Sequence, residues 1–456
     1  MTQNGGSTDD IEGGRTTATG GREVSGGRTP TGQGGATRGG APLGGSVATG
    51  GSAATGGSVA TGGNVATGGS VATGGSVATG GSSSGAATGG DAGDAGSNFG
   101  GSAGATPGGA GGEPDGTGGT GGVGEECHRP PANLRVPSQY ATIQAAIDSA
   151  SDGDVIGVAP GTYYVNLDLS QKAVRLVSEQ GPAATILDGG NQGAVITIEG
   201  VAAGASVEGF TVQHGANYWG GGIELARASA LIRGNWFLDN VEFAGGFGAA
   251  IGGNGASPII EANVFRGNSC DDQFLSGVIS FVNDSSPRIV NNVLADNDCR
   301  GINFTVPESV TPEISNNTLI RNRTGIYVDG RVPSTTQVYR NNLIIGGEVG
   351  LKVMFGSAPT WVNNLIFGST VLVDGTADPT GQNGNLSAAP QLADVDAGDY
   401  RLTAASPAID AGTHAFGALP QYDQQGGARV VDGNGDHVAT VDIGAYEYGA
   451  PIVCTP

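Results

Sequence analysis

A segment near the C-terminus alternates acidic and amide side chains with glycine, in the order Asp432-Gly433-Asn434-Gly435-Asp436. Oxygen ligands at alternate positions of a glycine-bent loop are typical of a calcium site, and such loops end on a bidentate carboxylate. Asp442 arrives one position early for that role and is Asp rather than Glu. The pattern therefore predicts either a Ca²⁺ site or a turn built by Asp and Asn side chains.

A second set of carboxylates lies in the middle of the chain and comprises Asp271, Asp272, Asp296 and Asp298. Carboxylate oxygens hold Ca²⁺, and a bound metal would acidify the α-proton of a uronate, which a basic side chain then removes by β-elimination. Arg300 and Lys352 are the candidate bases. The alternative is a solvated acidic rim without catalytic function.

Two adjacent aromatic residues, Tyr218 and Trp219, precede the run Gly220–Gly222. Rings on an exposed turn beside glycines would make a flat platform for a sugar ring. The alternative is that one ring turns inward and fills the loop. The four histidines show no metal-ligand spacing.

The elements that position these residues follow from a repeat. An Asn precedes a short apolar run every ~22 to 29 residues, a period typical of solenoid proteins. The repeated residues are Asn235, Asn263, Asn292, Asn317, Asn342 and Asn364. Because stacked coils lie ~4.8 Å apart, we expect the amides from Asn263 to Asn364 to form one hydrogen-bonded ladder.

Each repeat contains three short strands: one after a glycine, one often after a proline, and one after the ladder Asn. This predicts an all-β fold, a right-handed parallel β-helix of nine to eleven coils over residues 155–395. Alternation along the strand that follows the glycine should point four side chains outward. These are Glu224, Asn303, Tyr327 and Lys352.

Four cysteines are present. Cys270 and Cys299 each lie seven residues after a ladder Asn, so stacking brings their Cα atoms within disulfide range. We expect this pair to be bridged, the alternative being two free thiols. Cys127 and Cys454 flank the folded part and can pair only if one terminal segment runs back along the solenoid.

The remaining segments differ in composition. Residues 1–126 are rich in Gly, Ala, Ser and Thr and predict a disordered tether. Residues 127–154 should cap the solenoid, with a helix over Tyr140–Ala150, and residues 396–456 should form a C-terminal cap module. We further expect strands over Val155–Val158 and Ser206–Val212, and a turn over Pro160–Tyr163.

The 456 residues carry a formal net charge of −22, which makes nucleic acid and anionic membranes poor partners. No apolar run is long enough to span a bilayer. The sequence as given opens without a signal peptide, yet the acidity, the cysteines and the tether favour export, so we expect an extracellular or cell-surface protein. We also expect a monomer.

Two stretches resemble known groups. Ala141–Asp148, Gly153–Ile156 and Pro160–Tyr163 resemble the opening of pectin-lyase-like β-helix proteins. Ser406–Gly412 and Val441–Tyr448 are similar to the choice-of-anchor tail module of bacterial surface β-helix proteins. The resemblance implies the fold, an exported surface protein, and a substrate groove on the glycine-preceded strand and its loops. It implies no single activity, because fold alone does not define function.

The sequence therefore predicts that a loop face binds polysaccharide or another surface partner. Its members would be Tyr218, Trp219, Glu224, Asp271, Asp272, Asp298, Arg300, Asn303, Tyr327 and Lys352. The first alternative is a polysaccharide lyase or hydrolase acting on the same face, favoured by a base beside a carboxylate-lined metal pocket. The second is a structural or adhesive solenoid, favoured by a surface without a groove.

Overall fold

The computed structural model describes residues 131–453, apart from residues 202, 244, 272–275, 307–309, 331–336 and 357. The predictions for residues 1–126, Asp272, Cys127 and Cys454 concern positions outside this described part.

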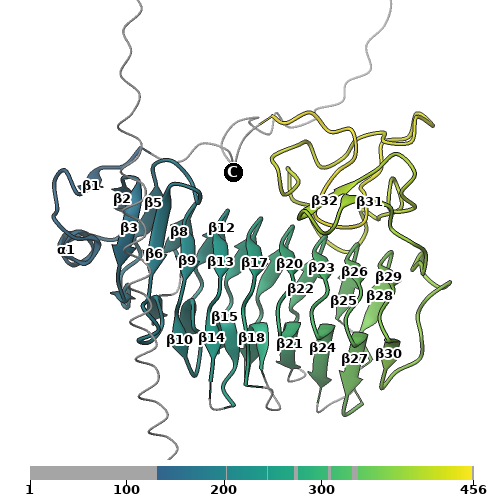
Figure 1. Cartoon of the computed structure of the whole chain (residues 1–456), viewed down its shortest axis with the longest axis horizontal. Helices are drawn as coiled ribbons and strands as arrows, with labels where there is room; N and C mark the ends of the chain where they lie inside the picture. Colours follow the sequence, from purple (N-terminus) through teal and green to yellow (C-terminus); the bar gives the residue numbers. More distant parts are fainter. Residues whose placement is uncertain are drawn as a thin grey trace, which may run out of the picture. The chain divides into compact units, whose positions relative to one another are not determined.

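The described chain winds into nine coils of three strands, and equivalent strands of successive coils pair in parallel to form three sheets (Figure 1). The first sheet holds β1 (Leu134–Val136), β2 (Val155–Val158), β5 (Arg175–Ser178), β8 (Ser206–Glu208), β12 (Leu231–Arg233), β16 (Ile259–Glu261), β19 (Arg288–Val290), β22 (Glu313–Ser315), β25 (Val338–Arg340) and β28 (Thr360–Val362). The predicted parallel β-helix and its coil number are confirmed.

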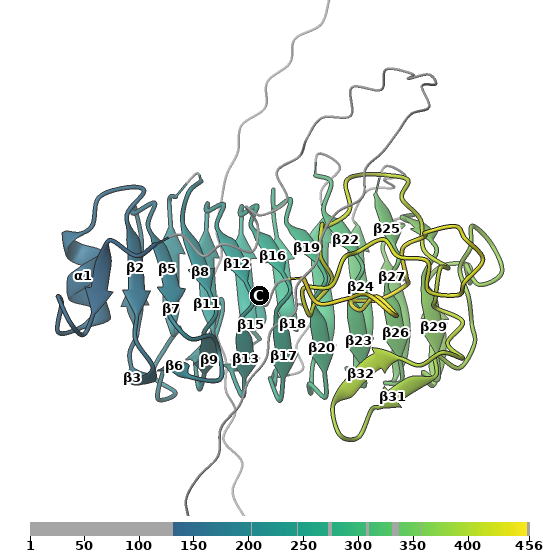
Figure 2. The ribbon, with the colours of Figure 1, turned by 90° about the horizontal axis from the view of Figure 1, so that it is seen from above.

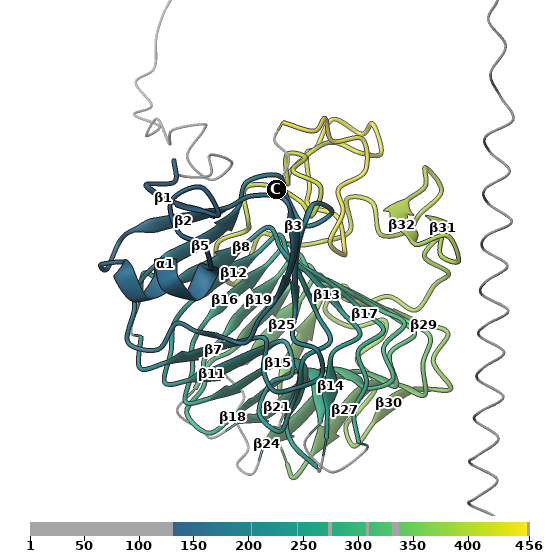
Figure 3. The ribbon, with the colours of Figure 1, turned by 60° about the vertical axis from the view of Figure 1, so that its left-hand side comes forward.

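The second and third sheets complete each coil, and Figure 3 shows the three sheets as separate sides of the solenoid. The second sheet holds β3 (Gly161–Tyr164), β6 (Thr185–Asp188), β9 (Thr211–Gln213), β13 (Trp236–Leu238), β17 (Val264–Arg266), β20 (Val293–Ala295), β23 (Thr318–Ile320), β26 (Leu343–Ile345) and β29 (Leu365–Phe367). The third holds β4 (Leu167–Asp168), β7 (Ile196–Glu199), β11 (Ile223–Ala226), β15 (Gly248–Asn254), β18 (Gly277–Val282), β21 (Arg300–Val306), β24 (Thr324–Gly330), β27 (Val349–Met354) and β30 (Val371–Asp374).

The core lies inside the coils, where one side chain from each strand stacks on its equivalent in the next coil. Ile223, Ile251 and Ile279 form such a column in the third sheet. In the second sheet the rings of Phe237 and Phe265 stack at 4.8 Å. Because each coil buries its apolar side chains mainly against its neighbours, the apolar residue at a fixed place in every repeat is what builds this core.

The N-terminal end of the solenoid is closed by helix α1 (Ile143–Ser149), which lies within the predicted Tyr140–Ala150. Thr142 caps it by accepting a hydrogen bond from the amide of Ala145 at 3.1 Å. Its apolar face, Ile143, Ala146 and Ile147, is buried as predicted. The helix therefore covers core that the first coil would otherwise expose.

Two predicted elements were wrong. The single strand expected over Ser206–Val212 is divided into β8 and β9, because Gly209 turns the chain at φ 77°. The turn expected over Pro160–Tyr163 is instead the first strand of the second sheet, β3. In both places the corner between sheets is only two residues long, which is too short to leave a loop signal in the sequence.

The asparagine ladder is confirmed. Nδ2 of each ladder Asn donates to Oδ1 of the next at 3.0–3.1 Å, and the side chains are fully buried. The ladder begins at Asn235 and extends one step beyond the prediction, because Asn364 donates to Asn385 at 3.0 Å. Each Oδ1 also accepts a hydrogen bond from the backbone N–H of the ladder Asn in the preceding coil. The ladder therefore satisfies backbone groups at the buried corner between the first and second sheets.

A second ladder, which was not predicted from the sequence, lies five residues further along four successive coils. Asn240, Asn268, Asn297 and Asn322 are buried and joined by side-chain hydrogen bonds of 2.9–3.1 Å. It holds the corner where the chain leaves the second sheet. The Asn-to-Asn spacing of five residues, which recurs in four successive repeats, was the available signal.

The first Asn of each later pair has a separate role, which is to bind the C-terminal module (residues 392–453). Asn291, Asn316, Asn341 and Asn363 donate to the carbonyls of Tyr422, Asp442, Thr413 and Ala411 respectively. Earlier coils carry Gly234 and Ala262 at this place. Figure 2 shows the yellow C-terminal segment over the later coils, so the chain runs back along the solenoid.

Candidate functional site

The loop face is formed by the turns that lead from the second sheet into the third. A minor parallel ladder holds these turns in register: β10 (Ala216–Asn217) pairs with β14 (Val241–Glu242). Isolated bridges continue it from Val241 to Ser269 and from Ser269 to Asp298. Turn residues of four successive coils therefore lie side by side, as the sequence predicts.

Three aromatic rings cluster on this face. Trp219 stacks on Phe247 with ring centroids 4.3 Å apart and planes 7° from parallel. Tyr218 meets both rings edge-on, at 5.5 Å from Trp219 and 5.7 Å from Phe247. Tyr218 is 38% exposed, Trp219 is half-buried and Phe247 is buried. Each of the two predicted alternatives, an exposed ring and a ring turned inward, applies to one residue of the pair. Trp219 packs on Phe247, while Tyr218 faces solvent.

Glycines beneath the cluster allow the aromatic turn to approach the third sheet. A Cβ on Gly252 would overlap the Trp219 carbonyl, and one on Gly246 would overlap the Tyr218 carbonyl. Larger residues at either place would push the turn away from the strands. The glycine-rich sequence around residues 245–253 is therefore a packing requirement of the cluster.

Polar groups surround the cluster. Asn217 donates to Oε2 of Glu224 at 2.7 Å, so a carboxylate and an amide lie together beside the rings. Glu242 is buried and accepts the amides of Gly246 and Asp271. This region can therefore offer aromatic faces, carboxylate oxygens and an amide to one ligand.

The outer row of the third sheet has the predicted register, in which Asn303 pairs with Tyr327 and Tyr327 with Lys352. Its exposure differs from the prediction, because Asn303 is 0% and Tyr327 is 6% exposed. Neither side chain is part of the open surface. Alternation of a strand defines its outward side but does not show what covers that side.

These buried residues interact with one another. The Arg300 guanidinium lies 4.1 Å from the centroid of the Tyr327 ring and donates to Oδ1 of Asn303 at 3.4 Å. Asn303 in turn donates to Ser280 at 2.8 Å. Burial raises the pKa of Tyr327, against the opposing charge of Arg300. The other candidate base, Lys352, forms an ion pair with Asp374 at 2.9 Å.

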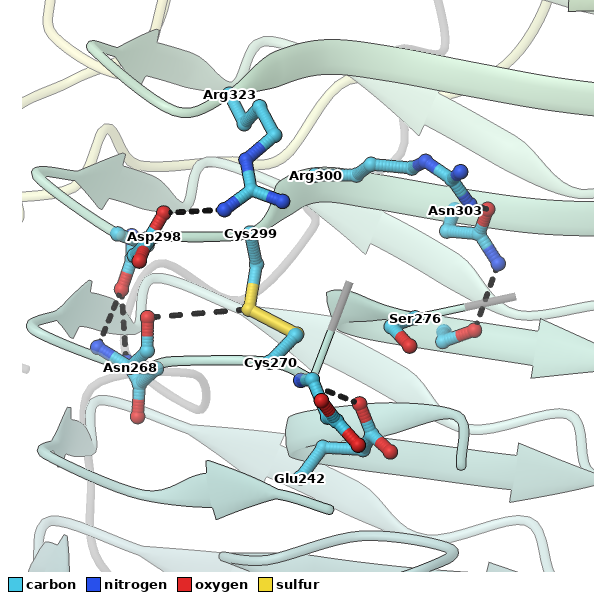
Figure 4. The surroundings of a disulfide bond; sticks show 12 residues. Glu242, Asn268, Cys270, Ser276, Asp298, Cys299, Arg300, Asn303 and Arg323 are labelled. Atoms are coloured by element: carbon cyan, nitrogen blue, oxygen red, sulfur yellow. Dashed lines mark hydrogen bonds and ion pairs between the residues drawn. A yellow bond between two sulfur atoms is a disulfide. The ribbon is translucent and has the colours of Figure 1, made fainter. Parts of the chain in front are cut away.

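Figure 4 shows the disulfide between Cys270 and Cys299, whose Cα atoms are 5.4 Å apart. The predicted pairing is confirmed. The bridge joins consecutive coils within the loop face. Near it, Glu242 accepts the Asp271 amide and Arg323 pairs with Asp298 at 2.6 Å.

Replacing both Cys270 and Cys299 with alanine is expected to lower the free energy of unfolding by ~3–4 kcal/mol, because the bridge closes a loop of moderate length in the unfolded chain. Chemical denaturation of the wild type and the double variant, without reductant, measures the change. Peptide mapping of unreduced, secreted protein should recover the linked peptides. Free thiols at both positions in that material would contradict the bridge.

The described members of the predicted acidic set do not form one cluster. Asp296 binds Arg321 at 2.6 Å and lies 3.5 Å from Arg266, on the side of the C-terminal module, whereas Asp298 binds Arg323. The hydrogen bond that Arg321 donates to Asp296 raises the pKa of the Arg321 guanidinium. In the part of the chain that the structure describes, no group of three or more His, Cys, Asp or Glu is placed to hold a metal ion.

In the Asp432–Asp436 loop, side-chain oxygens accept hydrogen bonds from backbone amides of the same segment. Asp432 accepts the amides of Gly435 and His437, and Asn434 accepts that of Asp436. Asp442 is buried outside the loop and accepts the amides of Asp410 and Tyr448. The Asp442 carboxylate therefore does not bind the loop. The loop has the hydrogen bonds of an Asx turn, which was the alternative to a calcium site.

One polar group was missed by sequence reasoning. Oδ2 of Asp188 lies 2.9 Å from Nδ1 of His214 and accepts Nε2 of Gln213 at 2.8 Å. Burial opposes ionisation of Asp188, but hydrogen bonds from Gln213, Gly190 and His214 outweigh it and lower the pKa of the carboxyl. Asp188 belongs to the preceding coil, and no motif links it to His214.

The comparison with protein families agrees with this fold. A family model described as a right handed beta helix region matches residues 194–366. The described part of the chain is a right-handed parallel β-helix, as the repeat predicted. No curated protein sequence matches this chain. The resemblance of the C-terminal residues to a choice-of-anchor module stays a prediction.

Solved structures with a similar chain path include the pectin methylesterase from Aspergillus niger, with 16% identity, a TM-score of 0.37, and coverage of 60% of this chain and 94% of that one. The pectate lyase Pel9A has 16% identity and a TM-score of 0.35, covering 68% and 91%. An α-1,3-glucanase catalytic unit from Streptomyces thermodiastaticus has 11% identity and a TM-score of 0.26, covering 58% and 70%. These likenesses describe the path of the chain alone.

Within the described residues, no helix combines the length and the apolar character needed to cross a membrane.

Proposed function

We propose that this protein is an exported or cell-surface β-helix that binds polysaccharide along its loop face. The observation that carries the proposal is the Tyr218–Trp219–Phe247 cluster, in which Tyr218 is presented to solvent on a fixed aromatic base. A ring that is already immobilised loses little conformational entropy when a sugar stacks on it. The Cys270–Cys299 bridge supports export, because disulfides persist in oxidising compartments.

The shape of the face suits a chain-like ligand. Its turns repeat at the coil spacing, so polar groups recur along the solenoid axis rather than around one point. Asn217 and Glu224 lie beside the rings and can exchange hydrogen bonds with sugar hydroxyls. A polymer with a regular repeat can use several of these groups at once, which a compact ligand cannot.

Charge favours neutral polysaccharides in the absence of metal. The chain has a formal charge of −22, and Glu224 and Glu242 lie close to the rings. These carboxylates would repel a polyuronate unless Ca²⁺ bridges the two. Ca²⁺ at Asp271, Asp298 or the Asp432–Asp436 loop remains part of the proposal for acidic ligands only.

The first alternative is catalysis on the same face. Arg300 would then have to act from its stack on Tyr327, and Lys352 from its ion pair with Asp374. Both cations are engaged, and the described carboxylates around them do not form a metal pocket, so the geometry supports binding better than a lyase or hydrolase mechanism. The second alternative, a purely structural solenoid, requires no ligand.

The Tyr218→Ala, Trp219→Ala double variant is expected to lose ~1–3 kcal/mol of binding free energy for a glycan that the wild type binds, because both rings would be lost as anchors. A glycan array with and without CaCl₂, followed by calorimetry on the hits, measures this loss. Tyr218→Ala alone removes the exposed ring while keeping the Trp219–Phe247 stack, which separates loss of contact from loss of loop structure.

Phe416→Ala removes a more exposed ring from the C-terminal module and is the control. Unchanged affinity in the double variant, with an unaltered circular dichroism spectrum, would remove the platform from the proposal. Wild-type protein that binds no glycan in either buffer would favour the structural solenoid. Release of shortened or unsaturated sugars from a bound glycan would establish the enzymatic alternative.

A further inference from the structure

The outer face of the second sheet has two halves of different composition. Over the later coils its outward side chains are mainly aliphatic, among them Val293, Ile320, Leu343 and Leu365. The C-terminal module packs on them, with Tyr400, Leu402, Ile443 and Ala445 in the shared clusters. This half is an interface between two parts of one folded chain.

Each strand of the second sheet has two outward side chains, and equivalent side chains of successive coils form two rows along the solenoid. In the earlier coils these two rows hold different residues. One row passes through Tyr164, Asp188 and Gln213, and the adjacent row passes through Thr211 and Trp236. Tyr164 is 79% exposed and Trp236 is 38% exposed. The register places these residues on one continuous surface, beyond the module's contacts at Val264 and Arg266.

The change in composition indicates a change in what each half contacts. Aliphatic side chains without polar groups suit a permanently dry protein contact, as in the later coils. Exposed aromatic rings interspersed with carboxylate, amide and imidazole suit a ligand that carries both flat apolar faces and hydroxyl groups. The earlier half, Tyr164 to Trp236, is therefore ill-suited to the partner that covers the later half.

The polar groups of this half are already held in position. Asp188 binds both Gln213 and His214, and the Asp188 carboxylate can only accept, so Nδ1 of His214 is its donor. Nε2 of His214 is then left to face away from Asp188, and the side chain is 41% exposed. Fixed hydrogen-bonding groups on a rigid sheet need little ordering when a ligand binds.

The two rings are three coils apart, which corresponds to ~14 Å along the solenoid axis at the ~4.8 Å strand spacing. Tyr164 and Trp236 could therefore contact separate units of one chain, with Asp188, Gln213 and His214 between them. Asp188 is buried and hydrogen-bonded to Gln213 and His214, and Arg266 lies beyond the strip beside Asp296, so neither offers an open charge to a ligand. Neither a polyanion nor a polycation would match such a surface, whereas an uncharged polymer would.

We propose that the strip from Tyr164 to Trp236 on the second sheet binds an uncharged polysaccharide chain lying along the solenoid axis. The strip lies on a different sheet from the Tyr218–Trp219 platform and does not depend on it. A protein with both surfaces would hold two chains, or two segments of one network, at once.

The test compares four forms of the full chain: wild type, Tyr164→Ala with Trp236→Ala, Tyr218→Ala with Trp219→Ala, and the combined quadruple variant. Probes are soluble xylan, galactomannan, laminarin and hydroxyethylcellulose, together with insoluble cellulose in a sedimentation assay. At least one probe should bind the wild type and bind the Tyr164/Trp236 variant at least tenfold more weakly. That loss should persist in the background of the platform variant, which separates this strip from the proposed loop-face function.

Tyr164→Phe with Trp236→Phe keeps both rings and should retain binding, whereas Phe355→Ala removes an exposed ring elsewhere and should change nothing. The proposal is overturned if no uncharged probe binds the wild type, or if the Tyr164/Trp236 variant binds every probe as the wild type does. It is also overturned if light scattering shows a wild-type dimer that this variant makes monomeric, because a second copy would then occupy the strip.

Discussion

The variant Asn317→Ala is expected to lower the free energy of unfolding by about 3–5 kcal/mol, although it removes only one small side chain. Oδ1 of Asn317 accepts the backbone amide and Nδ2 of Asn292, both within 3.1 Å. Its own Nδ2 donates to Asn342 and to the carbonyls of Ile289 and Ser315. Alanine leaves several of these buried groups without a partner, and each such group costs ~1–3 kcal/mol.

Local amide exchange is the measurement, because a solenoid need not unfold as a single unit. Protection should fall in the coils on both sides of residue 317 and much less in the first two coils. Asn254→Ala is the matched control, since that half-buried amide accepts a hydrogen bond from Asn283 in an exposed pair, and it should change stability by less than ~0.5 kcal/mol. Equal effects of the two substitutions would show that the ladder contributes nothing beyond ordinary surface amides.

The C-terminal module is expected to become less stable as the pH rises from 5 to 9. In its interior, Glu447 and Asp442 lie around the fully buried Arg429. Asp423 accepts a hydrogen bond from the backbone amide of Glu447, and the backbone amide of Asp410 donates to Asp442. Burial raises the pKa of Asp442 to about 6, against its amide hydrogen bonds. Burial likewise raises the pKa of Glu447 to about 9, against the charge of Arg429.

The sign follows from proton counting. Unfolded carboxyls titrate near pH ~4, so between that pH and the raised values the folded module binds more protons than the unfolded one. The stabilisation of the module by these two carboxyls is therefore fully present below pH ~4. The part due to Asp442 is lost as the pH rises through about 6, and the part due to Glu447 as it rises through about 9. We expect a loss on the order of 6 kcal/mol between pH 5 and 9, most of it from Glu447.

Amide exchange of residues 441–448, corrected for the intrinsic pH dependence of the rates, measures this loss, with β13 of the early coils as the internal reference. Glu447→Gln should flatten the upper part of the profile, because glutamine stays neutral throughout. Protection that rises with pH in the module, or a profile that Glu447→Gln leaves unchanged, would show that both carboxyls are ionised when folded.

The sequence by itself determined the repeating features of this protein. Asn263 to Asn364 recur at one place in the coil, and a fixed place in a parallel solenoid means a stacked column, so the ladder followed without coordinates. The same reasoning paired Cys270 with Cys299, because equal offsets from the ladder become adjacent positions in space. Coil number and the buried Ile columns follow from the same periodicity.

Contacts outside that period were decided by the tertiary structure. Alternation placed Asn303 and Tyr327 on the outer side of the third sheet, but only the folded chain shows that they are buried there. Spacing likewise gave no hint that Phe247 would lie beneath Trp219, or that Asp188 would bind His214. Such pairs join turns and strand ends of different coils, and the variable lengths of the turns break the repeat.

The C-terminal module is the largest of these differences. In the later coils the ladder Asn is preceded by a second Asn, which the sequence indicated only as a further member of the repeat. In the structure, Asn291, Asn316 and Asn341 donate to carbonyls more than 70 residues further along the chain. A period describes only neighbours in the stack, and the return of the chain across four coils is a contact between distant segments. It alone decides which half of the second sheet is covered by the module and which half remains exposed.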